Sequence, residues 1–286
     1  MTIASAIKPS SLSPQQFQDL RDIIYEISGI FFAENKLYLL ENRLGRRTRE
    51  LGLESFDAYI KHIKTQDSGS PEYHQIYNAI TINETFFFRF QAQLESFKKL
   101  LSDIKKTRQA QGSNSIKIWS AASSSGEELY TIAIILDEFF GPDLKNWDIY
   151  LLGTDISHRA LQIAGNAMYG NNSFRGSMTP EQKAKYFAPE GNTFKLRDDV
   201  KQLVQFRYLN LNDTMEMRKL TSLDFVFCRN VMIYFDEEMK KRVLRSIYGS
   251  LGHGGYLFLG EAESLHGISS AFKVEHFSGA FAYKKE

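Results

Sequence analysis

The chain has 286 residues, more than one typical domain and fewer than three, so we expect two domains. Hydrophobic residues make up 43% of the chain and aromatic residues 13%, which supports a packed core and excludes a disordered protein. Lys and Arg number 35 against 34 Asp and Glu, and the net charge of +1 gives no overall field that would attract nucleic acid or an anionic membrane.

The cellular compartment is indicated by the cysteine content and by the start of the chain. Cys228 is the single cysteine, so it cannot form an internal disulfide. No basic segment followed by an apolar run opens the chain, and no apolar stretch approaches the roughly 20 residues that cross a bilayer. We therefore expect a cytoplasmic protein that does not insert into a membrane.

Helix signals dominate the first part of the chain. Ser13 supplies a hydroxyl cap, Pro14 stands in the first turn, and Gln16 follows the cap by three residues. Apolar residues then recur at helical spacing over residues 17–27, 37–51, 56–63 and 73–80. This pattern predicts an N-terminal all-helical domain with its linker over residues 1–92.

From residue 93 onward, strand and helix signals alternate. A charged amphipathic helix is expected over 97–110, and helices with apolar faces are expected over 129–140 and 161–168. Strands are expected at 116–119, 149–155, 204–208, 223–228 and 256–259. The alternation predicts a doubly wound α/β sheet over residues 93–286.

The alternation lapses over residues 171–202. A capped helix, TPEQKAKYF, is followed there by short strand-like pieces around Phe194 and Val200. We interpret this stretch as a small β subdomain, a hairpin, inserted into the sheet domain.

Two features at the ends of the first strands are typical of a ligand site. The segment IWSAASSSGEELYTIA reads as a strand, a turn of small residues and a helix start, which lets backbone approach a ligand and offers free N–H groups. A tight turn without a ligand explains the same pattern, since the GxGxxG fingerprint is absent. Asp155 ends the next strand, where its carboxylate would either accept from the ribose hydroxyls of a nucleoside cofactor or cap the following helix.

Several other chemistries are disfavoured by missing motifs. The chain lacks the GxxxxGK phosphate loop of nucleotide triphosphatases. Its six histidines are scattered without an HExxH or paired spacing, so we expect no metal. No basic patch is large enough to bind duplex nucleic acid.

Two aromatic segments each contain one arginine and one asparagine. TINETFFFRF holds Asn83 and Arg89, and FCRNVMIYF holds Arg229 and Asn230. A charge in so apolar a setting is costly unless it is paired. Each arginine therefore either faces a ligand or forms a structural salt bridge with a nearby acid.

Six segments resemble, in order and spacing, the hallmark segments of the CheR chemotaxis receptor glutamate methyltransferases: TINETFFFR, WSAASSSGEELYTIA, GTDIS, LNLND, FCRNVMIYFD and GGYLFLGEAESL. FCRNVMIYFD is the most specific of them, and the resemblance covers nearly the whole chain, including the helix KLYLLENRLGRRTRELG. It implies a Rossmann-like class I methyltransferase sheet behind an N-terminal all-α domain. It also implies S-adenosylmethionine as cofactor, S-adenosylhomocysteine as product, and no metal.

The resemblance further implies the residues of the site. Asp155 would take the ribose, and Glu128 would lie near the turn under the methionine end of the cofactor. Arg89 would stand beside the transferring methyl group with Tyr234 close by, which makes these two the expected catalytic residues. The full set expected to hold the cofactor is Asn83, Thr85, Arg89, Glu128, Asp155, Asn210, Leu211, Arg229 and Asn230.

The implied reaction transfers a methyl group to glutamate carboxylates of chemoreceptors, forming methyl esters in chemotaxis adaptation. A glutamate side chain, with a pKa of about 4.3, is already ionised at neutral pH, so no general base is required. The protein's main task would be to position the carboxylate and exclude water. A non-catalytic adaptor that senses S-adenosylmethionine is the alternative, whereas a DNA methyltransferase is disfavoured because an NPPY-like motif is absent.

The implied partner is the cytoplasmic domain of a methyl-accepting chemoreceptor. A positive face formed by Arg43, Arg46, Arg47 and Arg49 would dock it, although an ordinary solvated helix face explains the same charges. The stretch FAPEGNTFKLRDD is short and has a single glycine, so we expect no tether to a receptor's C-terminal pentapeptide. No obligate dimer seam is evident, and we expect a monomer.

Overall fold

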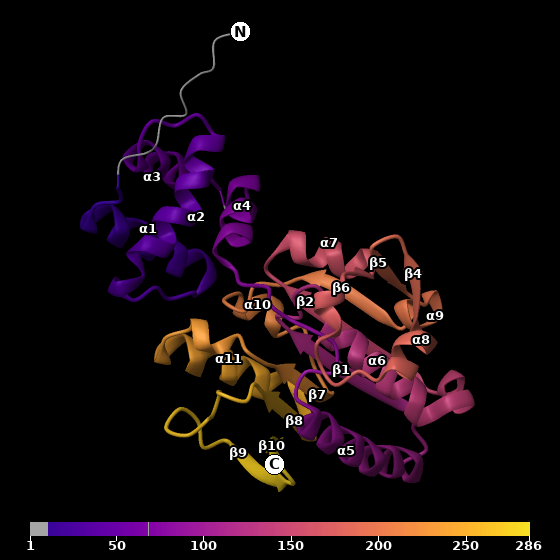
Figure 1. The fold of residues 1–286 in the computed structure, drawn as a ribbon. Helices are drawn as coiled ribbons and strands as arrows, with labels where there is room; N and C mark the ends of the chain where they lie inside the picture. Colours follow the sequence, from indigo (N-terminus) through magenta and orange to yellow (C-terminus); the bar gives the residue numbers. More distant parts are fainter. Residues whose placement is uncertain (1–10, 68) are drawn as a thin grey trace. The chain divides into compact units, whose positions relative to one another are not determined.

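The computed structural model describes residues 11–67 and 69–286, which fall into two compact units (Figure 1). The first unit ends at Ile82 and also takes in Tyr234–Asp236. The second unit comprises Asn83–Ile233 and Glu237–Glu286. The start of the chain, on which the expectation of no secretion signal rests, lies outside the described residues.

The first unit is helical, as its sequence pattern predicts. Its elements are α1 (Pro14–Ser28), η1 (Glu34–Lys36), α2 (Leu37–Glu50), α3 (Phe56–Lys64) and α4 (Pro71–Ile80). The expected capping box is present, because the Ser13 side chain accepts from the Gln16 N–H and the Gln16 side chain accepts from the Ser13 N–H. The helices pack through apolar residues that are at most 1% exposed: Leu20, Ile24, Leu40, Leu44, Tyr59 and Ile76.

The second unit is built on a seven-stranded sheet in the order β6-β2-β1-β7-β8-β10-β9. Its strands are β1 (Ser115–Ala121), β2 (Asp148–Asp155), β6 (Val204–Tyr208), β7 (Leu223–Cys228), β8 (Leu251–Leu259), β9 (Phe272–Phe277) and β10 (Ala280–Lys285). The first five of these run parallel, while β10 pairs antiparallel with both β8 and β9. This confirms the doubly wound α/β sheet, closed by an antiparallel hairpin.

Helices pack on this sheet from several points of the chain (Figure 1). Helices α6 and α7 contact β2, α11 contacts β8, and α5 contacts β10. The helical elements of the unit are α5 (Gln91–Ala110), α6 (Glu127–Phe140), η2 (Gly141–Asn146), α7 (His158–Asn166), η3 (Asn171–Phe174), α8 (Pro180–Tyr186), α9 (Asp198–Gln202), α10 (Thr214–Met217), η4 (Met232–Tyr234) and α11 (Glu237–Ser250), where η4 ends at a residue of the first unit.

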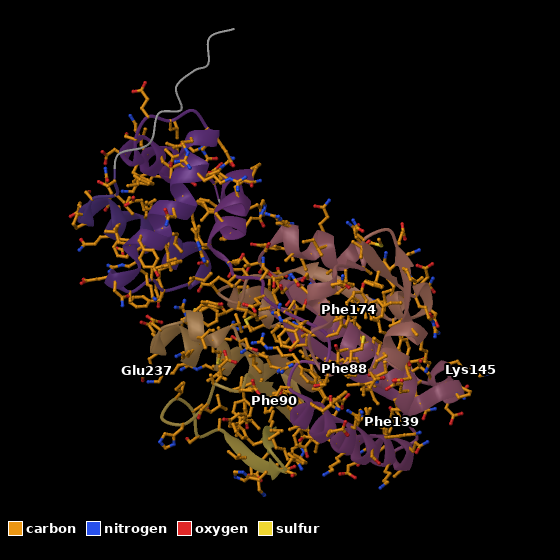
Figure 2. The ribbon with its side chains drawn as sticks, in the orientation of Figure 1. Phe88, Phe90, Phe139, Lys145, Phe174 and Glu237 are labelled. Carbon is orange, nitrogen blue, oxygen red and sulfur yellow. The ribbon has the colours of Figure 1, made fainter. Side chains whose placement is uncertain are left out.

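The small inserted β subdomain is also confirmed. It is a three-stranded sheet in the order β3-β5-β4, made of β3 (Met168–Tyr169), β4 (Phe187–Glu190) and β5 (Thr193–Leu196). Strands β4 and β5 form a hairpin in which Phe187 pairs with Leu196. Phe174, which Figure 2 labels, packs edge-on against Phe187 of β4 and Phe194 of β5.

Some local expectations were wrong. Met168 was expected to continue a helix, but Ala167 adopts a left-handed φ of 55° that ends α7, and Met168 pairs with Lys195 in β3. Val200 was expected in a strand, but it is the buried residue of α9, whose first turn carries two aspartates that favour a helix start. The sequence patterns also did not identify α11, β9 or β10.

Across the described residues, no helix combines the length and apolar character that a membrane crossing requires.

Candidate functional site

The expected cofactor residues of the second unit converge on one edge of the sheet. Strands β6, β2, β1 and β7 are neighbours and run parallel, so their carboxyl ends lie side by side. The chain builds outward from β1 through β2 to β6 on one side, and continues with β7 and β8 on the other. The point between β1 and β7 is therefore a topological switch point, which is where open α/β sheets bind ligands.

The turn between β1 and α6 lies at this switch point and is held tightly. Ala122, Ser124 and Gly126 all have positive φ, at 57°, 53° and 94°. A side chain at Gly126 would bring its Cβ to 2.9 Å from the Phe206 ring, so the turn packs closely on β6. The Ser124 hydroxyl also donates to the backbone carbonyl of Asn83 at 3.1 Å, which ties the turn to the segment before α5.

Asp155 sits at the end of β2 and faces this turn. One carboxylate oxygen accepts from the Ser124 backbone N–H and the other from the Ser157 backbone N–H, both at 2.8 Å. The helix-cap alternative for Asp155 is wrong, because the Ser157 side chain caps α7 by accepting from the Ala160 N–H. Burial raises the pKa of the Asp155 carboxyl above its ordinary value, while these backbone donors partly offset the rise.

The loop after β6 lies against the same strand end. The Leu209 N–H donates to the backbone carbonyl of Asp155 at 3.1 Å, which places Asn210 and Leu211 immediately beyond Asp155. The Asn210 side-chain oxygen accepts from the Asn212 N–H at 3.0 Å, and the Leu211 side chain is buried. Both expected residues of this loop are thus next to Asp155.

Arg229 and Glu128 form a buried ion pair between β7 and α6. Arg229 Nη1 lies 3.0 Å from Glu128 Oε2, and Glu128 Oε1 accepts from the Ser120 hydroxyl at 2.7 Å. Arg229 Nη2 donates to the backbone carbonyl of Arg89 at 2.9 Å. The Arg229 Nε–H is buried and has no hydrogen-bond partner. Arg229 therefore has the structural salt bridge that its setting required and keeps one donor unused.

The segment that carries Asn83, Thr85 and Arg89 has a strained backbone. Phe88 and Phe90, both labelled in Figure 2, stand on either side of Arg89 in the chain. Their φ values of 53° and 66° are rare for bulky residues. The Phe88 N–H donates to the Thr131 hydroxyl of α6 at 3.1 Å, which holds the segment in place.

The Arg89 guanidinium has no acidic partner among the described residues. Its Nη1 donates to the backbone carbonyl of Glu84 at 3.3 Å, and its Cζ lies 5.3 Å from the centre of the Phe86 ring. The nearby carboxylate of Glu84 pairs instead with Arg175 at 2.6 Å. The salt-bridge alternative therefore gains no support for Arg89.

Glu263 is a site residue that the sequence patterns did not single out. It is 5% exposed, and its Oε2 accepts from the backbone N–H groups of Asn230 and Gly260, both at 2.7 Å, while Oε1 accepts from the Ile233 N–H at 3.3 Å. Asn230 has a φ of 60°, and a Cβ at Gly260 would lie 2.8 Å from the Asn230 side-chain nitrogen. Glu263 thus clamps the end of β7 to the end of β8. An acid in a loop carries no signal of this role by itself.

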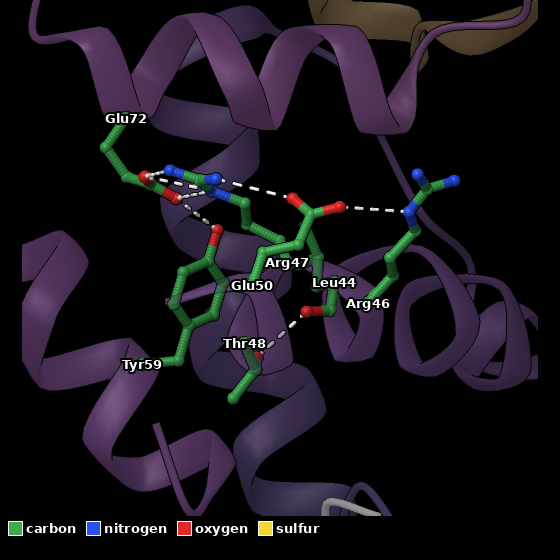
Figure 3. A network of polar contacts seen from close by, with 7 residues as sticks. All are labelled: Leu44, Arg46, Arg47, Thr48, Glu50, Tyr59 and Glu72. Atoms are coloured by element: carbon green, nitrogen blue, oxygen red, sulfur yellow. Dashed lines mark hydrogen bonds and ion pairs between the residues drawn. The ribbon is translucent and has the colours of Figure 1, made fainter. Parts of the chain in front are cut away.

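Tyr234 and the four arginines of α2 belong to the first unit. Arg47 is held inside it, since Nη2 lies 2.6 Å from Glu72 Oε2 and Nη1 lies 3.4 Å from Glu50 Oε2 (Figure 3). Tyr59 donates its hydroxyl to the same Glu72 at 2.8 Å. Arg43 donates to the Ile80 carbonyl, whereas Arg46 and Arg49 are exposed at the helix surface, with Arg46 pairing with Glu50. The catalytic role of Tyr234 and the docking role of the arginines stay predictions.

The residues at the sheet edge fit S-adenosylmethionine. A carboxylate has about four acceptor positions, and the two backbone donors leave Asp155 with capacity for hydroxyl groups. The unused Nε–H of Arg229 is the kind of buried donor that a bound carboxylate would satisfy. Within residues 11–67 and 69–286, no group of three or more His, Cys, Asp or Glu side chains is arranged to hold a metal ion.

The parallel sheet, its switch point and these residues define a class I methyltransferase that uses S-adenosylmethionine. The model of the CheR methyltransferase SAM-binding domain matches residues 83–280, and the model of the CheR methyltransferase all-alpha domain matches residues 15–81. The chain therefore belongs to the CheR methyltransferase family.

Named relatives span nearly the same length. The chain is 37% identical to chemotaxis protein methyltransferase 2 of Vibrio cholerae, over 96% of this chain and 94% of the relative. It is 33% identical to chemotaxis protein methyltransferase 1 of Pseudomonas aeruginosa, over 96% and 99%. The chemotaxis protein methyltransferase of Escherichia coli is 33% identical over 92% and 89%. These relatives give no support to a non-catalytic adaptor.

Proposed function

We propose that this methyltransferase acts on glutamate side chains of chemoreceptors and forms glutamate methyl esters in chemotaxis adaptation. The names of the relatives support a role in chemotaxis. The observation that supports an acidic substrate is that only one of the two site arginines has an acidic partner. Glu128 neutralises Arg229, whereas Arg89 has no carboxylate partner among the described residues. An arginine left in this state is suited to receive a carboxylate through paired N–H donors.

The cofactor residues have distinct tasks in this proposal. S-adenosylmethionine supplies the methyl group when it is bound. Asp155 would accept from the ribose hydroxyls, and Arg229 would donate its unused Nε–H to the carboxylate of the cofactor. Glu128 would hold Arg229 in place for this contact. Asn83, Thr85, Asn210, Leu211 and Asn230 would complete the binding site.

The protein groups around the substrate would orient it and need not take up a proton. The substrate carboxylate is ionised at neutral pH, because its pKa is about 4.3. Arg89 would align one carboxylate oxygen with the methyl carbon, with Tyr234 beside it, and the apolar residues near Arg89 would exclude water. Too strong an ion pair between Arg89 and the substrate carboxylate would stabilise that carboxylate and lower its reactivity as a nucleophile. The proposed role of Arg89 is therefore to position the carboxylate.

The proposed partner is the cytoplasmic domain of a methyl-accepting chemoreceptor. Arg46 and Arg49 are the exposed members of the α2 arginines and would make the first contacts with an acidic receptor surface. The β4–β5 hairpin turns at Gly191 within a short loop, which supports the expectation that no C-terminal pentapeptide tether is gripped there. We further propose that the protein is a cytoplasmic monomer.

A methyl-transfer assay with a receptor cytoplasmic fragment tests this function. Tritiated S-adenosylmethionine should label the fragment, and mild base should release the label as methanol, as expected for an ester. Arg89→Ala should lower kcat/KM for the receptor by about a hundredfold, equivalent to about 2.7 kcal/mol. Lys145→Ala, an exposed change in η2 before β2 begins, is the control and should retain activity. Base-stable label, or full activity of Arg89→Ala, would contradict the proposal.

A further inference from the structure

A pocket lies between α10 and α11, on the second unit. Its volume is about 250 Å³, and it is lined by Thr214, Arg218, Arg242, Arg245, Ser246 and Gly249. We propose that this pocket binds a phosphoryl group, as inorganic phosphate or a small phosphomonoester. The proposal does not depend on the proposed function, because none of these residues belongs to the cofactor set.

The three arginines of this pocket carry no compensating acid. None of Arg218, Arg242 and Arg245 forms an ion pair among the described residues, and no Asp or Glu lines the pocket. The lysines next to them differ, since Lys219 pairs with Glu216 and Lys241 pairs with Glu237. Three like charges around one cavity repel one another unless an anion lies between them.

One of the arginines is already oriented. Arg242 Nη1 donates to Asn212 Oδ1 at 3.0 Å, and the residue is half-buried. This contact restrains the guanidinium and leaves its other N–H groups for a ligand, so less side-chain entropy is lost on binding. Arg218 and Arg245 are exposed, with Arg218 at the C-terminal end of α10 and Arg245 in α11. The pocket therefore combines one fixed arginine with two that can close on a ligand.

The lining selects the class of ligand. Guanidinium groups match the oxygens of a phosphate through paired hydrogen bonds, and the Thr214 hydroxyl adds a further donor. The Ser246 hydroxyl donates instead to the backbone carbonyl of Arg242 at 3.2 Å. Binding sites for larger organic molecules are mostly apolar, but no apolar or aromatic side chain lines this pocket. It therefore has groups for a compact dianion and none for a nucleobase or an acyl chain.

Isothermal titration of the full chain with inorganic phosphate tests the proposal, at constant ionic strength set with sodium chloride. The wild-type protein should bind one phosphate per chain. Arg218→Ala and Arg245→Ala should each weaken the affinity by about tenfold, as expected for the loss of a charge-assisted hydrogen bond. Lys99→Ala removes one exposed positive charge from α5 and should leave the affinity unchanged.

Three results would overturn the proposal. They are the absence of saturable binding, an unchanged affinity in the Arg218→Ala, Arg245→Ala double variant, and a glutamate affinity equal to that for phosphate. Circular dichroism and binding of S-adenosylhomocysteine by each variant show whether it is folded. If phosphate binds as expected while S-adenosylhomocysteine does not bind the wild type, the proposed function fails and the phosphate site stands.

Discussion

Arg229 and Glu128 join the two halves of the sheet at its switch point, with Nη1 of the arginine 3.0 Å from Oε2 of the glutamate. The Arg229 side chain is 3% exposed and that of Glu128 is 14% exposed, so the pair is largely removed from water. Arg229 follows β7 and Glu128 lies in the first turn of α6, two elements that flank the proposed cofactor position. The pair thus fixes the guanidinium whose Nε–H is unused.

Removing the acid of this pair should cost both stability and cofactor affinity. Glu128→Ala leaves Arg229 buried without a counter-charge, and we expect it to lower the free energy of unfolding by about 3 kcal/mol. Glu128→Gln keeps an acceptor for Arg229 and should lose less. Urea denaturation and titration with S-adenosylhomocysteine measure the two effects. Equal stability of both variants and the wild type would show that the pair does not stabilise the fold.

Glu263 should act on cofactor binding through Asn230. Glu263→Gln replaces one acceptor oxygen with an amide nitrogen, which cannot accept, and this leaves at least one buried backbone N–H unsatisfied at a cost of about 1–3 kcal/mol. We expect a weaker affinity for S-adenosylhomocysteine and a higher KM for S-adenosylmethionine, with a smaller change in kcat. Glu261→Gln, an exposed change two residues away, is the control.

A lower melting temperature with unchanged cofactor affinity would make Glu263 merely structural. Gly260→Ala provides an independent check, because its Cβ would lie 2.7 Å from Glu263 Oε2 and 2.8 Å from the Asn230 side-chain nitrogen. This variant should weaken the cofactor affinity in the same direction as Glu263→Gln.

The sequence predicts structure best where an element's boundary is set by residues that are close together in the chain. Ser13, Pro14 and Gln16 form a capping box that depends on a few consecutive residues, and the helix begins where they predict. The strand β7 begins and ends as its apolar run predicts, because a buried parallel strand is a nearly continuous apolar segment. The edge strand β6 also has the predicted bounds, although its residues alternate between half-buried and exposed.

Long-range relationships account for what the sequence does not reveal. Asp155 is of a residue type that often caps helices, and only the fold shows that Ser157 takes that role. The fold also shows that Asp155 accepts from Ser124, which is 31 residues away in the chain. The clamp by Glu263 joins groups 33 residues apart, and no local pattern encodes it. The hairpin of β9 and β10 was missed because its alternating residues are partly exposed and lack a strong apolar run.

The stability of the protein should depend on pH through Glu127. This carboxyl is buried and accepts from the hydroxyls of Ser125 and Ser173, and burial raises its pKa above the ordinary 4.5. A raised pKa in the folded state means that the folded state binds more protons than the unfolded state between the two pKa values. The contribution of Glu127 to stability is therefore full below about pH 4.5 and is lost as the pH rises through the raised pKa.

Glu127→Gln removes this titration. Its free energy of unfolding relative to the wild type should increase from pH 5 to pH 8, as measured by urea denaturation at each pH. Glu181→Gln is the control, and its difference from the wild type should stay constant over this range. Hydrogen bonds from the backbone and from Thr179 lower the pKa of that exposed carboxyl, so it is ionised in both the folded and the unfolded state above about pH 5. A difference between Glu127→Gln and the wild type that is constant with pH would show that Glu127 does not titrate in this range.

Among the arginines of α2, Arg47 should be structural, whereas the exposed Arg46 and Arg49 should dock the receptor. Arg47→Ala leaves Glu72, which is 5% exposed, without its counter-charge and should lower the free energy of unfolding by about 3 kcal/mol. Arg46 is 79% exposed and pairs with Glu50 at the surface, so Arg46→Ala should change stability by less than about 0.5 kcal/mol.

Binding to a receptor cytoplasmic fragment should show the reverse order at matched folded concentrations. Arg46→Ala and Arg49→Ala should weaken binding, and the loss should shrink as salt is raised, because exposed charges are screened. Arg47→Ala should bind with nearly wild-type affinity once its folded fraction is taken into account, since its guanidinium is already engaged by Glu72 and Glu50. Salt-insensitive binding, or a larger loss for Arg47→Ala than for Arg46→Ala, would place the receptor contact elsewhere than on the exposed arginines of this helix.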